Sequence, residues 1–138
     1  MAYRYHLHPS HNLVVIRGKG AKWTGEDILK SADEIVADDQ FTPGYDWIYD
    51  VRYVHHTVID VEGMERIVDQ FRIFREKGQV DPNGNSVIVG SDEDVHFTGT
   101  LYRYKSNRTE RQFQIVDTME EALRWLGVEA SAAEILEA

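Results

Sequence analysis

Short runs of β-branched and aromatic residues alternate with longer amphipathic segments along this chain, and this alternation constrains the fold more than any other feature. The runs Leu13–Ile16, Trp47–Val51 and Ser86–Val89 have the apolar character of buried strands. A segment with apolar residues at helical spacing follows each of them. Because consecutive parallel strands need a crossover connection, usually a helix, this order predicts an α/β domain with a mostly parallel sheet.

Four helices are expected, each beginning at a residue whose side chain can accept a hydrogen bond from the first helical turn: Thr24, Asp60, Ser91 and Thr118. Thr24 with Asp27 resembles a capping box, in which the side chain at each position bonds the backbone N–H of the other. Gly78 and Gly127 are typical of helix C-termini.

The N-terminal residues predict a hairpin. Tyr3 to His8 alternates weakly, and Pro9–Asn12 is a turn that leads into the buried run at Leu13. We expect the first strand to be the antiparallel edge of the sheet. The predicted fold is α/β, with about five strands in a mostly parallel sheet, an antiparallel edge strand and about four helices. Residues 1–128 are expected to form a single domain, and residues 129–138 an acidic tail rich in Ala and Glu.

The composition excludes several classes of protein. The 138 residues include no cysteine, so disulfides, thiol nucleophiles and thiolate metal sites are excluded. The net charge of -9 disfavours binding to nucleic acid, and no stretch approaches the roughly 18 apolar residues of a membrane span. The first residues lack the order of a secretory signal. We expect a cytoplasmic protein with no nucleic-acid partner, no integral membrane association and no cofactor.

Two segments carry a resemblance to a known family. Ile59–Met64 follows a predicted strand and opens a helix, and the closing strand and helix over Phe113–Gly127 contain the sequence Glu-Ala-Leu-Arg-Trp-Leu. In these segments and in the order of its elements the chain resembles STAS domains, the fold of bacterial anti-sigma factor antagonists, and the SpoIIAA-like proteins grouped with them. The resemblance spans roughly residues 3 to 127. It implies a STAS/SpoIIAA-like fold and a bacterial regulatory protein that binds another protein.

The chain departs from the antagonists at the position of their regulatory phosphorylation. The resemblance implies a serine or threonine there, but the matching residue is Glu62. A carboxylate cannot be phosphorylated by that chemistry. Glu62 does place a negative charge near a helix N-terminus, which the helix dipole stabilises by roughly 0.3 to 1 kcal/mol. Two interpretations stay open, a permanently phosphoserine-like surface and the ordinary preference of first helical turns for Glu.

Open parallel sheets bind ligands outside the carboxyl ends of their strands. In this chain that edge, which we call the rim, is expected to include residues 18–23, 52–60 and 90–94. We predict that the rim docks another protein, or a second copy of the chain. The candidate binding residues are those that surround the start of the second helix: Arg52, His55, His56, Asp60, Glu62, Gly63 and Met64.

Three other patterns do not predict a site. Gly18-Lys19-Gly20 lacks the third glycine of a dinucleotide loop, which would fall at Trp23. His55 and His56 are adjacent, so on an extended segment their rings point to opposite sides, and no metal site is predicted there. A solvated helix end explains the basic stretch of Arg103, Lys105, Arg108 and Arg111.

The preferred function is a non-catalytic regulatory or protein-interaction module of STAS-like fold. The alternative is a carrier or sensor of a small hydrophobic ligand, because SpoIIAA-like proteins are also compared with the lipid-binding Sec14-type fold and the aromatic residues could line a pocket. A weaker alternative is an enzyme that uses His55 or His56 as acid or base. No recognisable motif places a nucleophile beside them, so no catalytic residue is predicted.

Overall fold

The computed structural model describes residues 3–136. A short 3-10 turn (Pro9–His11) joins the first two strands, and the remaining elements in chain order are β1 (Tyr3–His8), β2 (Leu13–Gly18), β3 (Gly20–Thr24), α1 (Gly25–Val36), β4 (Asp46–Asp50), β5 (Val54–Val58), α2 (Val61–Glu76), β6 (Ser86–Val89), α3 (Glu93–Ser106), β7 (Phe113–Val116), α4 (Met119–Leu126) and α5 (Ala132–Leu136).

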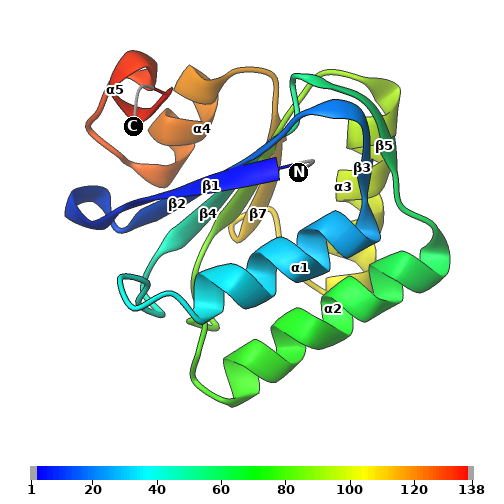
Figure 1. Ribbon diagram of the computed structural model, residues 1–138, viewed down its shortest axis with the longest axis horizontal. Helices are drawn as coiled ribbons and strands as arrows, with labels where there is room; N and C mark the ends of the chain where they lie inside the picture. Colours follow the sequence, from blue (N-terminus) through cyan, green and yellow to red (C-terminus); the bar gives the residue numbers. More distant parts are fainter. Residues whose placement is uncertain (1–2, 137–138) are drawn as a thin grey trace.

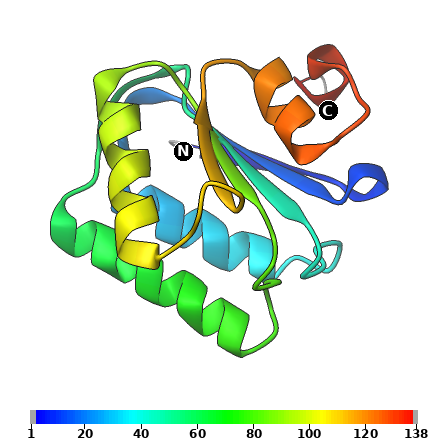
Figure 2. The ribbon, with the colours of Figure 1, turned by 180° about the vertical axis from the view of Figure 1, so that it is seen from behind.

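Five strands form the main sheet in the order β1-β2-β4-β6-β7. β1 is antiparallel to β2, and all other neighbouring strands are parallel. Helices α1, α2 and α3 cover one face of the sheet, and α4 and α5 cover part of the other (Figures 1 and 2). The predicted α/β class, the mostly parallel sheet and its antiparallel edge strand are confirmed.

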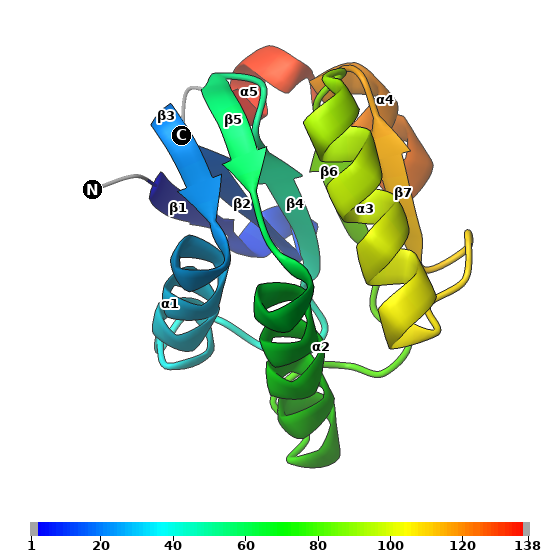
Figure 3. The same ribbon diagram turned by 90° about the vertical axis from the view of Figure 1, so that its right-hand side faces the viewer.

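A second sheet of two parallel strands, β3 and β5, departs from the prediction. Residues 18–23 and 52–60 were expected at the rim, with no paired strand predicted in either, but β3 and β5 occupy most of both segments. Trp23, Val54 and Thr57 face inward and are buried, whereas their neighbours in the same strands are mostly exposed. So few apolar residues give too weak a pattern for a strand prediction. Figure 3 shows the pair on the side of the sheet that carries α1, α2 and α3.

The main sheet lies between two apolar layers. The larger layer packs under α1, α2 and α3, and its largest buried members include Trp23, Trp47, Met64 and Phe71. The smaller layer lies on the opposite face and joins Leu13, Val15 and Ile48 of the sheet to Met119, Leu123 and Ile135 of α4 and α5. Because both faces are covered, the central strands are apolar on both sides, as their sequences indicate.

Three of the four predicted helix starts are confirmed. Thr24 and Asp27 form a capping box, and the side chains of Asp60 and Thr118 each accept a hydrogen bond from a first-turn N–H group. The third start is wrong by one residue, because the N-cap of α3 is Asp92 rather than Ser91. Both residue types are good caps, so composition alone does not distinguish the two positions.

The segment predicted as a tail contains α5. Ile135 is 2% exposed and packs in the apolar layer that α4 completes. This contact holds the last described turn against the domain. Within residues 3–136, no helix is long and apolar enough to cross a membrane.

Candidate functional site

The carboxyl ends of β2, β4 and β6 lie at one edge of the main sheet, which is the rim. β3 and β5 lie beside this edge and run directly toward the first turns of α1 and α2 (Figure 3). α3 contacts β5, and Asp94 in its first turn lies near His56 of β5. The rim is therefore built from strand ends, one short sheet and the starts of three helices.

A surface groove of about 370 Å³ lies between β5 and α3. We call it the rim groove, and it is lined by His56, Thr57, Val58, Ile59, Asp60, Asp94, Phe97 and Thr98. Val58 is 51% exposed and Phe97 is 65% exposed. Val61, in the first turn of α2, is 52% exposed. Single exposed apolar residues are ordinary, but here two of them, Val58 and Phe97, line the same groove.

Both predicted histidines lie on β5 and are exposed. His56 lines the rim groove, and its Nδ1 lies 3.7 Å from Oδ2 of Asp94 on α3. Both side chains are more than half exposed, so solvent screens this pair strongly. Among residues 3–136 no group of three His, Asp or Glu side chains could hold a metal ion.

The start of α2 brings together three of the predicted residues. Asp60 caps the helix, with Oδ1 accepting a hydrogen bond of 2.6 Å from the backbone N–H of Gly63. Gly63 lies against Gly25, where a Cβ atom would be 3.6 Å from the Gly63 Cα, so the first turns of α1 and α2 touch. Glu62 is exposed. Its carboxylate is therefore available to a partner at the N-terminus of α2.

Met64 lies inside the domain rather than on the rim surface. It is 1% exposed and lines a cavity of about 50 Å³ between the sheet, α2 and α3. The hydroxyl of Tyr49, which also lines this cavity, is buried and has no hydrogen-bond partner within the described residues. Burial raises the pKa of Tyr49 well above its ordinary value. Thr98 lies in the walls of both the cavity and the rim groove.

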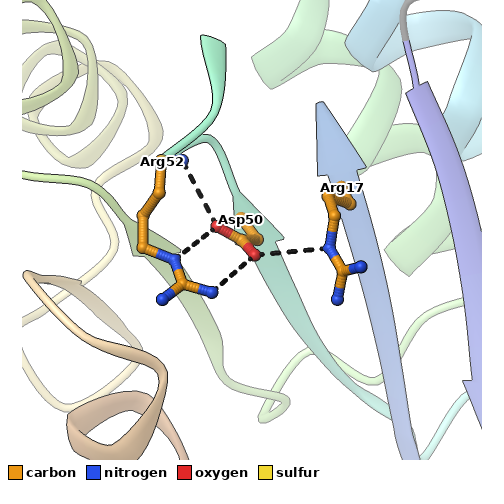
Figure 4. A network of polar contacts seen from close by, with 3 residues as sticks. All are labelled: Arg17, Asp50 and Arg52. Atoms are coloured by element: carbon orange, nitrogen blue, oxygen red, sulfur yellow. Dashed lines mark hydrogen bonds and ion pairs between the residues drawn. The ribbon is translucent and has the colours of Figure 1, made fainter. Parts of the chain in front are cut away.

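Arg52 belongs to a polar network on the other face of the sheet (Figure 4). Its Nε and Nη2 donate hydrogen bonds of 2.9 and 3.0 Å to the two carboxylate oxygens of Asp50, which is fully buried. The hydrogen bonds to Asp50 raise the pKa of Arg52, with burial opposing the shift. Arg17, at the end of β2, places its Nε 3.5 Å from Asp50 Oδ2.

Three residues at the rim were not singled out by the sequence. Phe97 is on the exposed side of α3, where the apolar spacing is irregular, and Val58 ends a strand that the sequence does not predict. Arg17 follows an apolar run and carried no motif. The register of β2 against β4 places it beside Asp50, a long-range pairing that local patterns do not contain.

No protein-family model matches the chain, and no curated protein sequence matches it significantly.

Proposed function

We propose that this chain is a non-catalytic interaction module that docks another protein in the rim groove. The observation that carries the proposal is the exposure of Val58 and Phe97 in one groove, with exposed Val61 following Asp60 of that groove in the chain, at the edge where open parallel sheets bind their ligands. Exposing these side chains to water is unfavourable, and covering them would recover about 25 cal/mol for each Å² of apolar surface removed from water. A partner surface that supplies an apolar side chain fits this groove.

The charge around the rim groove specifies the partner further. Two exposed carboxylates line the groove, Asp60 and Asp94, and three more are exposed next to them in the sequence at the starts of α2 and α3: Glu62, Asp92 and Glu93. His56 is the one basic side chain among the lining residues. Complementary charge steers association and fixes register more than it adds affinity. We therefore expect a partner segment in which an apolar anchor is flanked by Lys or Arg.

The STAS/SpoIIAA-like relationship belongs to the same proposal. The order of the main elements, the Asp60-capped helix that carries Glu62, and the closing strand and helix that end in Trp125-Leu126-Gly127 support it. In the antagonists the matching helix start presents the phosphorylated residue to the partner. A carboxylate at Glu62 would provide a constant negative charge at that place, where the helix dipole stabilises it.

Selection from a random peptide library on the immobilised protein tests the proposal. Selected peptides are expected to combine one or two aromatic or aliphatic residues with Lys or Arg, and Phe97→Ser should weaken their binding at least tenfold. Tyr104→Ser is the matched control, because Tyr104 is 80% exposed on the same helix but does not line the groove. Equal binding to both variants would contradict docking in the rim groove.

A second candidate function is the binding of a small apolar molecule, which the cavity beneath α2 and α3 favours. Its lining is almost entirely apolar, and the unpartnered Tyr49 hydroxyl would be the one polar contact from β4. The volume of about 50 Å³ is well below the roughly 300 to 1,000 Å³ of ordinary ligand sites. Binding would therefore require α3 to move away from the sheet, and for this reason we rank it second.

Native mass spectrometry separates the two candidates. A stoichiometric small-molecule adduct that disappears on denaturation would favour the ligand carrier. A ligand-free mass from protein purified from its own source would contradict the carrier and leave the docking module as the preferred function.

A further inference from the structure

One part of the fold of this acidic protein contains no acidic residue. Residues 1–25 and 51–59 contain five Lys or Arg residues and five of the six histidines, but no Asp or Glu, although the whole chain has a net charge of -9. These two segments supply β1, β2, β3 and β5. β1 pairs with β2, and β3 pairs with β5. The two segments without Asp or Glu are therefore next to each other in the structure.

Within this region, Arg4 and Arg17 lie side by side on the face of the sheet opposite α1, α2 and α3, and Arg52 contacts the same carboxylate as Arg17. Arg4 on β1 is directly opposite Arg17 on β2, and Arg17 is directly opposite Asp50 on β4. Paired residues on neighbouring strands project to the same face of a sheet. That face is the one on which Val15 and Ile48 pack against α4.

Asp50 holds two of the guanidinium groups close together. Arg17 Nε and Arg52 Nη2 both contact the same oxygen, Asp50 Oδ2, at 3.5 and 3.0 Å. Because both nitrogens contact one oxygen atom, the two guanidinium groups lie close to each other. Figure 4 shows the guanidinium groups on either side of the carboxylate. The remaining nitrogens, both Nη atoms of Arg17 and Nη1 of Arg52, donate no hydrogen bond within residues 3–136.

The charges of this cluster do not balance. Asp50 is fully buried and already engaged, and Glu120 is the other carboxylate that acts on Arg52, so two carboxylates are set against three arginines. Like charges directly opposite each other on a sheet, as Arg4 and Arg17 are, are destabilising. The pKa of nearby His6 is lowered, first by burial and then by Arg4 and Arg17, which agrees with an excess of positive potential on this face. Local arrangements that cost stability are expected at functional sites.

We propose that Arg4, Arg17 and Arg52, the last two held together by Asp50, bind the phosphoryl group of a small molecule. A phosphoryl group offers several anionic oxygens and two negative charges, which matches several guanidinium groups, whereas a single carboxylate is satisfied by one bidentate arginine. The site is separate from the rim groove, because its side chains lie on the α4 face and the groove lies beside α3. The two proposals therefore succeed or fail independently.

Titration of the full chain with inorganic phosphate at constant ionic strength tests the site, with arginine Nε–H signals followed by NMR. Saturable shifts of Arg17 and Arg52 are expected, and acetate should bind more weakly than phosphate. Arg17→Gln should raise the phosphate Kd about tenfold, the loss of roughly one charge-assisted hydrogen bond. Arg111→Gln is the matched control, because Arg111 is exposed beside β7 at the far end of the sheet order and should leave the Kd unchanged.

A second variant keeps the test decisive if Arg17→Gln fails to fold. Arg4 is exposed and makes no contact with Asp50, so Arg4→Gln should keep the fold and raise the Kd several-fold. Addition of sulfate, which stays dianionic throughout the titration, should raise the pKa of His6.

Shifts that increase linearly with phosphate and equal those produced by chloride would overturn the proposal. A loss of phosphate affinity in Arg111→Gln equal to that in Arg17→Gln would also overturn the proposal. A tighter Kd for phenyl phosphate than for phosphate would identify a phosphate ester, and equal values the free anion.

Discussion

Val58 at the end of β5 and Phe97 in α3 line the same surface groove, and both side chains are more than half exposed. Their contribution to folding should therefore be small. We expect Phe97→Ser to change the free energy of unfolding by no more than about 0.5 kcal/mol, as is usual for surface substitutions. Phe113→Ala, at a buried position of β7, should cost about 3 to 5 kcal/mol. Urea denaturation measures both, and a large loss in Phe97→Ser would mean that Phe97 serves the fold.

The charge of Glu62 is predicted to serve the partner rather than the fold. Glu62→Gln keeps the size of the side chain and removes its negative charge, so binding of a basic library-selected peptide should weaken several-fold, chiefly through slower association. Glu110→Gln removes an exposed charge from the loop before β7 and should leave the peptide affinity unchanged. Surface plasmon resonance gives both rates. If the two variants bind alike, the ordinary helix-start interpretation of Glu62 is the correct one.

Gly99 provides the close approach of α3 to the sheet. A Cβ atom on it would lie 2.6 Å from both Cγ1 and Cδ1 of Ile115, closer than atoms can pack. Gly99→Ala should therefore destabilise the protein by about 1 to 3 kcal/mol, despite the gain of about 1 kcal/mol in helix propensity. In the Gly99→Ala/Ile115→Ala double variant the losses should be less than additive. Gly44→Ala, where a Cβ atom would meet nothing, is the control, and additive losses would show that the contact is not tight.

The last long helix should be anchored by Leu123 more than by Leu126. Leu123 is 2% exposed in the layer beneath α4, whereas Leu126 is only partly buried. We expect Leu123→Ala to cost about 2 to 5 kcal/mol and Leu126→Ala about 1 kcal/mol, because the apolar area that each loses differs. Equal losses measured by thermal or chemical unfolding would place Leu126 in an additional contact, such as an oligomer interface.

Acid should weaken the fold through two histidines of β1. Burial is the main reason that the pKa of both His6 and His8 is lowered, so the folded state disfavours their charged forms. The unfolded chain then binds more protons below about pH 6.5, and stability falls as the pH drops from there through the folded-state pKa values. His8→Gln should reduce this slope of unfolding free energy against pH. An unchanged slope would exclude His8 as its source.

The positions of the main elements were predictable because they depend on local patterns. Buried runs such as Leu13–Ile16 and the cap pair Thr24 and Asp27 contain their own signal, and the structure has these elements close to the predicted bounds. β3 and β5 were not predictable, because they gain stability from pairing with each other and from a few buried side chains such as Trp23.

The candidate site was predictable only in outline. The rim follows from the parallel topology, and Asp60 and Glu62 lie at the start of α2 as the cap pattern indicates. Met64 faces the core because of its place in the helical repeat beside Ile67. Val58 and Phe97 line one groove because of where α3 is placed, and Arg17 lies opposite Asp50 because of the sheet register. No short segment of sequence contains either relationship.

NMR mapping of a selected basic peptide on the ¹⁵N-labelled protein tests the central claim most directly. If the rim groove is the docking site, the largest amide shifts will fall in residues 56–62 and 93–98, and they will disappear in Phe97→Ser. Shifts centred on another surface, such as the far end of α3 around Tyr104, would contradict the account.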